Sequence, residues 1–186
     1  MRAAPVFVPL AALVIASVMV ALGCFTGAIL GMPSRIGLPP VLRAAGALAA
    51  ASGLSILGWV FKYRGLAFFY STYVTFLKAV RRVPLTEAGR AEPLIVAGPH
   101  RHVRHPAYSA YLLLFLGAWL ALDWSPLLLG GLYLFLWFQF VITPVEEREL
   151  KVLFGPEYES YARRVPKFIP APWRGKSPAG PKAPSR

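Results

Sequence analysis

Four apolar runs, at residues 6–30, 41–61, 107–122 and 127–143, constrain this chain more than any other feature of its sequence. Hydrophobic residues make up 56% of its 186 residues and charged residues 15%, which is more apolar surface than a soluble domain of this length can bury. A helix over the first run is longer than the hydrocarbon core of about 30 Å, so it can cross a bilayer with tilt. We therefore predict an all-α, polytopic membrane protein whose solvent and partner is the lipid bilayer.

The number of crossings depends on the aromatic segment at residues 65–80. As a helix this segment is about 24 Å long, which is short for a full crossing and suits a helix at the membrane surface. Four transmembrane helices then place both termini on one side, whereas a crossing here would make five. We interpret the first run as a retained span rather than a signal peptide, because its apolar core is too long for one. The single cysteine, Cys24, excludes an intrachain disulfide and is interpreted as a packing residue.

The charge balance is strongly basic, with 20 Lys and Arg against 8 Asp and Glu and a net charge of +12. Such a charge can indicate nucleic-acid binding. Here the cations flank the apolar runs, as they do in membrane proteins whose basic loops face anionic lipid. We therefore expect no nucleic-acid partner.

Changes of composition divide the chain into three parts. Residues 1–90 are predicted to hold the N-terminal membrane helices, the surface helix and a linker. Residues 91–170 are predicted to form a helical hairpin of two spans followed by an amphipathic helix at the membrane surface, which Gly155 and Pro156 interrupt. Residues 171–186 consist mostly of Pro, Gly, Ala, Ser, Lys and Arg, and we expect them to form a disordered basic tail.

A dense polar segment, GPHRHVRHPAY at residues 98–108, stands directly before the hairpin. Its three histidines suggest a metal site, but no cysteine is near and the interleaved Arg101 and Arg104 would repel a divalent cation, so we expect no metal. The arginines instead offer planar forks for an anion. Pro106 is predicted to open a helix, whose free amides add to such a site.

Glu146 and Glu147 are adjacent acids at the point where the last apolar run ends. One explanation is a surface ion pair between Glu147 and Lys151, which would contribute only a few tenths of a kcal/mol. The other is a binding site for a cationic ligand such as an ammonium or a sulfonium, because acids at a membrane edge are usually functional. We favour the ligand site. In a hairpin, these acids lie on the same side of the membrane as the polar segment.

The order and spacing of several motifs resemble the C-terminal half of the isoprenylcysteine carboxyl methyltransferase and phospholipid methyltransferase superfamily. These motifs are GP-x-R-x-V-RHP-x-Y, EE-x-x-L and FG-x-EY-x-x-Y-x-x-RVP, and the resemblance covers residues 94–170. It implies an integral membrane enzyme that uses S-adenosylmethionine. The chain departs from the family pattern at His100 and His102, where an aromatic is usual, and at Ala110, where glycine is usual.

Carried over to this chain, the resemblance places the RHP-x-Y segment and the acid pair in the cofactor pocket. Together with the arginine fork, it gives the candidate residues Arg101, Arg104, His105, Pro106, Tyr108, Glu146 and Glu147. Arg104 and Glu147 are the candidate catalytic residues. The expected reaction is methyl transfer to a carboxylate, thiol or amine of a lipid-like or prenylated acceptor, with the cofactor site on the cytoplasmic side. Two alternatives remain, a non-catalytic membrane scaffold and a nicotinamide-dependent membrane reductase of related fold.

Overall fold

The computed structural model describes residues 4–81 and 93–170, and the side chains of residues 9–65 and 93–170 within them. It contains no strand in these ranges, which confirms the all-α prediction. The predicted linker lies largely outside the described residues, and so does the predicted tail. The elements in chain order are α1 (Ala4–Ile29), α2 (Pro40–Arg81), the short 3-10 helix η2 (Gly98–Arg101), α3 (Pro106–Leu122), α4 (Ser125–Trp137), the π-helical turn η3 (Phe138–Ile142) and α5 (Thr143–Arg164).

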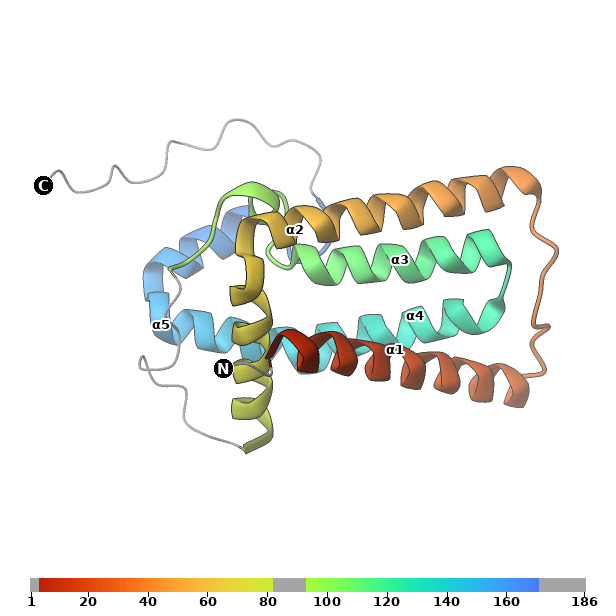
Figure 1. Ribbon diagram of the computed structural model, residues 1–186, viewed down its shortest axis with the longest axis horizontal. Coiled ribbons are helices and arrows are strands. Elements are labelled where there is room, and N and C mark those ends of the chain that lie inside the picture. The colour runs from red at the N-terminus through yellow and green to blue at the C-terminus, as the bar shows by residue number, and fades with distance from the viewer. Residues whose placement is uncertain (1–3, 82–92, 171–186) are drawn as a thin grey trace, which may run out of the picture.

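Four helices run side by side as a bundle in which α1 packs on α4 and α2 packs on α3 (Figure 1). Glycines make both pairings close. A Cβ on Gly53 of α2 would lie 2.9 Å from the carbonyl oxygen of Ala110, and one on Gly130 of α4 would lie 2.9 Å from that of Met19. Small residues allow this approach where burial from water does not drive helices together. Helix α2 approaches α3 closely at Gly46 and Gly53, whereas Gly58 has no described neighbour within 4 Å.

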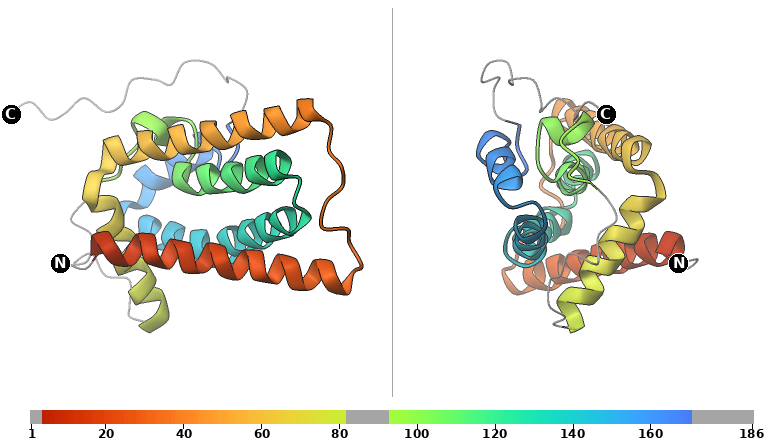
Figure 2. Two further views of the ribbon diagram at one scale, coloured as in Figure 1. Left: turned by 45° about the vertical axis from the view of Figure 1, so that its right-hand side comes forward. Right: turned by 90° about the vertical axis from the view of Figure 1, so that its left-hand side faces the viewer.

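Three helical stretches are long and apolar enough to cross a membrane, Pro9–Ile29, Pro40–Gly65 and Ser125–Arg164, and Pro106–Leu122 is a shorter apolar helix. Three of the four predicted crossings therefore have the length and composition of a span, and the fourth corresponds to the shorter helix. Gly65 has non-helical angles (φ 52°, ψ −142°), and the rest of α2 beyond it runs across the end of the bundle in both Figure 1 and Figure 2. This direction is the one expected of a surface helix.

At the end of the bundle away from α5, the hairpin turn holds the loop between α1 and α2. Asp123 caps α3 in a left-handed conformation (φ 51°). Its carboxylate accepts hydrogen bonds from the backbone N–H groups of Ile36, Gly37 and Leu38 at 3.2, 2.8 and 3.1 Å. Arg43 Nε also donates to the carbonyl oxygen of Ala121 at 3.1 Å. These contacts fix the two helical pairs relative to each other.

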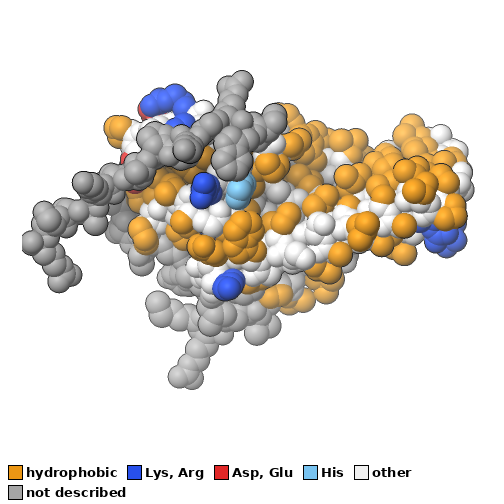
Figure 3. All heavy atoms as spheres, turned by 90° about the horizontal axis from the view of Figure 1, so that it is seen from above, with side chains coloured by type: hydrophobic (Ala, Val, Ile, Leu, Met, Phe, Trp, Pro, Cys, Tyr) orange, Lys and Arg blue, Asp and Glu red, His pale blue; other side chains and the backbone are white. Residues whose placement is uncertain are grey.

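The charged part of the chain gathers at the opposite end. Helix α5 continues α4 through the π turn and bends at Gly155 (φ 46°, ψ −124°), so the predicted interruption is confirmed. Apolar side chains cover the long bundle surface in Figure 3, and the acidic side chains visible on that face lie at the end opposite its right-hand tip. We place the membrane-crossing part of the last helix at residues 125–142, because charged side chains recur from Glu146 onward.

Candidate functional site

The polar segment before α3 folds into a compact loop that rests on α2. Gly98 has a positive φ of 59°, and a Cβ there would lie 2.7 Å from ring atoms of Tyr63, so only glycine fits this position. The chain then forms η2, turns at the exposed His102 and buries Val103. Pro106 opens α3 as predicted and is fully buried. The loop thereby directs Arg104 and His105 inward.

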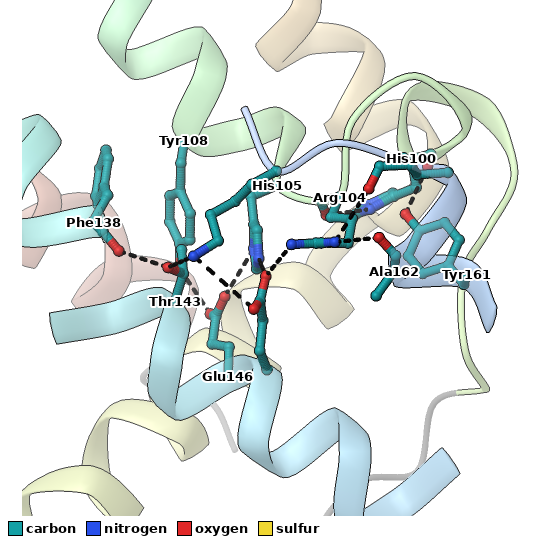
Figure 4. A network of polar contacts seen from close by, with 12 residues as sticks. His100, Arg104, His105, Tyr108, Phe138, Thr143, Glu146, Tyr161 and Ala162 are labelled. Carbon is teal, nitrogen blue, oxygen red and sulfur yellow. Dashed lines mark hydrogen bonds and ion pairs between the residues drawn. The ribbon is translucent and has the colours of Figure 1, made fainter. Parts of the chain in front are cut away.

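His105 bridges the two glutamates (Figure 4). Its Nε2 lies 3.1 Å from Oε1 of Glu147, and its Nδ1 lies 3.3 Å from Oε2 of Glu146. A ring nitrogen can bond to a carboxylate oxygen only by donating a hydrogen. Both contacts together therefore require the imidazolium form. The imidazole is buried, with a relative exposure of 7%, so its pairing is not weakened by water.

The electrostatics of the cluster agree with this protonation. Burial of the imidazole lowers the pKa of His105, but hydrogen bonds and charge interactions with Glu146 and Glu147 outweigh burial, and the net shift is upward. For Glu147, burial raises the pKa of the carboxyl, whereas the hydrogen bond to His105 and the charges of Arg104, His105 and Lys167 lower it by more. Both shifts favour the charged forms of the two side chains, and hence ion pairing within the cluster.

Arg104 joins the acid pair to the end of α5. Its Nη2 lies 3.0 Å from Oε1 of Glu147, and its Nη1 donates to the carbonyl oxygens of Ala162 and Val165 at 2.6 and 3.2 Å. The fork thus satisfies carbonyl groups at the C-terminal end of the helix, where cations are favourable. Arg104 positions α5 as well as neutralising Glu147.

An aromatic stack forms one wall of the cluster. The ring of Tyr108 lies between those of His105, at 5.6 Å, and Phe138, at 4.4 Å. The hydroxyl of Tyr108 donates to Oε1 of Glu146 at 2.7 Å. Phe138 begins the π turn, and Thr143 closes it, because its backbone N–H and its hydroxyl both donate to the carbonyl oxygen of Phe138. The π turn therefore lies directly beside the acid pair, as π turns often do at functional sites.

The chain returns over the site in a C-terminal strap, defined as residues 165–170. The backbone N–H groups of Arg104 and His105 donate to the strap carbonyls of Pro166 and Lys167 at 2.8 and 3.1 Å. The hydroxyl of Ser109 donates to the carbonyl oxygen of Phe168 at 2.7 Å. Lys167 Nζ lies 3.2 Å from Oγ1 of Thr143 and 4.0 Å from Oε2 of Glu147. The strap thus closes the cluster and adds a third cation to it.

The structure brings together six of the seven candidate residues, and Arg101 is the exception. Arg101 is exposed at the end of η2. Glu147 pairs with Arg104 and His105 rather than with Lys151, which is exposed. The sequence reasoning missed Thr143, Lys167 and Phe168. The sequence could have identified Lys167 as a site residue, since it directly follows the last motif, Arg164-Val165-Pro166.

The three histidines do not converge. His105 bonds to the glutamates, His100 Nδ1 lies 3.2 Å from the carbonyl oxygen of Arg104, and the His102 ring faces Trp59 at 5.9 Å. Among the residues whose positions are described, no group of three or more His, Cys, Asp or Glu side chains could hold a metal ion. Ala110, the expected glycine position, is fully buried against Gly53 of α2. Its methyl is therefore accommodated at a helix contact.

Taken together, the site offers two carboxylates, an aromatic stack and two orphaned hydrogen-bond donors. The donors are Nε of Arg104 and the hydroxyl of Tyr158, which are buried and have no hydrogen-bond partner among the described residues. Carboxylates suit a cation or hydroxyl groups, aromatic rings suit a flat heterocycle, and free donors suit an anion. The arrangement fits a zwitterionic ligand with an aromatic portion.

Comparisons with known proteins point to one family. Residues 42–157 match the family model described as phospholipid methyltransferase. A "Probable protein-S-isoprenylcysteine O-methyltransferase" of Oryza sativa subsp. indica is 32% identical over 125 residues, which are 60% of this chain and 62% of that protein. "Protein-S-isoprenylcysteine O-methyltransferase B" of Arabidopsis thaliana is 35% identical over 78 residues, 41% of this chain and 39% of that protein.

The "Protein-S-isoprenylcysteine O-methyltransferase" of Schizosaccharomyces pombe is 37% identical over 78 residues, 41% of this chain and 33% of that protein. The chain thus spans less than two thirds of the length of these curated relatives. No solved structure matches it.

Proposed function

Because the chain belongs to the phospholipid methyltransferase family, we propose that it is an integral membrane methyltransferase that uses S-adenosylmethionine to methylate a lipid-like acceptor. The observation that carries this proposal is the pair Glu146 and Glu147, held at the end of an apolar bundle and contacted by His105 and Tyr108. Two carboxylates in a partly buried site complement a ligand that carries a sulfonium and an ammonium.

The cofactor fits the other groups of the site as well. S-adenosylmethionine combines a sulfonium, an ammonium, a carboxylate, ribose hydroxyls and an adenine ring. Glu146 and Glu147 would hold the cationic groups and ribose hydroxyls, and the stack of His105, Tyr108 and Phe138 would contact the adenine. When bound, the cofactor supplies a methyl group already activated by the positive sulfur.

The chain then has to position the partners and exclude water. Glu147 is held in one orientation by Arg104 and His105, so little reorganisation is needed on binding. The strap covers the cluster through its bonds to Arg104, His105 and Ser109. Such closure keeps water from the reacting groups and strengthens the charge interactions inside.

Two features support an acceptor with an apolar tail. The relatives carry names that specify isoprenylcysteine as the methyl acceptor, and the bundle opens to lipid on its sides. An apolar groove of about 500 Å³ lies between α1, α3 and α4, lined by Ala16, Ser17, Val20, Ala21, Phe115 and Leu127. Phe115 also packs against the core cluster that contains Tyr108. We propose that the apolar tail of the acceptor lies in this groove, with the group that receives the methyl directed toward the site.

We assign the site to the cytoplasmic side. Basic side chains near the site end of the bundle include Lys62, Arg64, Arg148 and Lys151, whereas Arg35 and Arg43 stand near the opposite end. An excess of Lys and Arg marks the cytoplasmic side of membrane proteins. The polar cofactor would therefore enter from the cytoplasm, and the acceptor from the bilayer.

Cofactor binding tests this proposal, with calorimetry on the purified chain in detergent. Wild type is expected to bind S-adenosylmethionine but not NADPH, and Glu147→Gln to bind it at least tenfold more weakly, since a charge-assisted contact is lost. Glu157→Gln is the matched control, because Glu157 is exposed on the same helix. Folded wild-type protein that binds NADPH, or neither ligand, would contradict the proposal.

A labelling experiment identifies the acceptor class. The protein is incubated with methyl-labelled cofactor and native membrane extract, and the label is followed into lipid, protein and small-molecule fractions. The proposal expects label in the lipid or prenylated-protein fraction with wild type and its loss with Glu147→Gln.

A further inference from the structure

We propose that the hydroxyl of Tyr158 and the Nε of Arg104 bind the carboxylate of the cofactor's amino-acid portion, which makes Tyr158 a specificity-determining residue. The inference deepens the proposed function and rests on it. Tyr158 was not among the residues that the sequence pointed to as cofactor contacts.

The first observation is that two hydrogen-bond donors are buried without an acceptor. Tyr158 is among the largest fully buried side chains, with a relative exposure of 1%. Its hydroxyl and the Nε of Arg104 are enclosed by protein, yet neither has a hydrogen-bond partner among the described residues. Buried polar groups in folded proteins almost always have one, because an unmet donor is costly. Two unmet donors near one site indicate a missing acceptor.

The position of Tyr158 on α5 is the second observation. Tyr158, Tyr161 and Ala162 lie on one face of the helix, since residues three and four apart are neighbours there. Ala162 accepts a hydrogen bond from Arg104 at 2.6 Å, and the Tyr161 hydroxyl donates to the carbonyl oxygen of His100 at 2.7 Å. This face therefore packs against residues 100–104. Burial raises the pKa of the Tyr158 hydroxyl, and the charge of Glu147 raises it further.

The chemistry of the groups decides what the acceptor is. Glu146 and Glu147 are themselves acceptors and suit the cationic groups and hydroxyls of the cofactor. They would repel its carboxylate. A guanidinium N–H and a phenol O–H are both donors, and a carboxylate can accept from both at once. The two donors thus bind the carboxylate of the zwitterionic amino-acid group, and the glutamates bind its ammonium.

The test compares two ligands that differ only in the carboxylate. Calorimetry measures the affinities of S-adenosylmethionine and decarboxylated S-adenosylmethionine for wild type, Tyr158→Phe and Tyr161→Phe. For Tyr158→Phe we expect roughly tenfold weaker binding of S-adenosylmethionine and an unchanged affinity for the decarboxylated ligand. Its unfolding midpoint without ligand should not fall, because the hydroxyl has no partner to lose.

Tyr161→Phe is the matched control, since it removes a hydroxyl from the same helix that does have a partner. It should lower the unfolding midpoint and affect both ligands alike. An unchanged affinity of Tyr158→Phe for S-adenosylmethionine would overturn the inference, and so would an equal loss for both ligands. Failure of wild type to bind either ligand would instead refute the proposed function.

Discussion

The contact between α2 and α3 depends on Gly46, and Gly46→Ala tests whether the two helices lie as close as described. Gly46 is buried against α3. A Cβ built there would lie 2.5 Å from the backbone nitrogen of Ala121, 2.5 Å from Cβ of Leu120 and 2.8 Å from the carbonyl oxygen of Gly117. Non-bonded carbon atoms normally approach to about 3.5–4.0 Å. The helices would therefore have to separate by about 1 Å at this point.

Two of the three atoms that the new methyl would meet belong to the backbone of α3, so no side-chain rotation can relieve the clash. Overpacking of this kind costs about 1–3 kcal/mol. Helix propensity acts in the other direction, because alanine is favoured over glycine inside a helix by about 0.5–1 kcal/mol. The expected net result is a loss of about 1–2 kcal/mol of unfolding free energy.

Gly58→Ala supplies the matched control in the same helix. No described atom lies within 4 Å of a Cβ at Gly58, so only the propensity gain applies and stability should stay equal or rise. Unfolding is followed by circular dichroism in mixed micelles with increasing dodecyl sulfate, for wild type and both variants. Equal or higher stability of Gly46→Ala would refute the close packing of α2 on α3.

Two further predictions concern the opposite end of the bundle and the acid pair. Asp123→Ala should lower the thermal unfolding midpoint, because three backbone N–H groups lose their acceptor. Asp123→Asn should lower it less, since asparagine keeps one acceptor oxygen and tolerates the left-handed conformation. Equal midpoints for wild type and Asp123→Ala would contradict the role of this contact. The pKa of His105 is raised from 6.5 in the folded state, so its stabilising contribution is complete below pH 6.5 and is lost as the pH rises through the folded-state pKa. The difference in unfolding midpoint between wild type and His105→Gln should therefore shrink as the pH is raised from 6 toward alkaline values, and a difference that grows would show that the sign of the shift is wrong.

The sequence predicted the fold well because membrane burial imposes a strong and simple pattern. Residues 41–61 are apolar over a length that a spanning helix needs, and residues 107–122 form a shorter apolar run. The structure places α2 and α3 there. The interruption at Gly155 was predictable for a different reason, because glycine and proline determine such bends locally. The direction of residues 66–81 was harder, because the kink depends on the φ of Gly65, which composition does not reveal.

The site was predicted in part, and the missing residues share a cause. Arg104, His105, Tyr108 and the glutamates stand in motifs of recognisable spacing. Lys167 and Phe168 reach the cluster through backbone bonds between the strap and residues 104–109. Those bonds join segments about sixty residues apart and use carbonyl groups, which every residue has. Arg101 stays a prediction as a cofactor contact, because its side chain is exposed at the end of η2 although the sequence spacing suggested a fork with Arg104.

The π turn explains why the acids face the site at all. In an uninterrupted α-helix, successive residues are about 100° apart, so Glu147 would point roughly 180° away from Phe138. The π turn from Phe138 to Thr143 is wider than an α-helical turn, so each of its residues rotates the chain by less than 100°. Glu147 therefore lies closer to the face of Phe138 than it would in an uninterrupted helix. Phe138 and Glu146 can then both contact Tyr108 while Glu147 contacts His105. A helical wheel drawn from the sequence would have put Glu147 on the wrong face, so the phase of α5 is a property that the π turn adds to the motif.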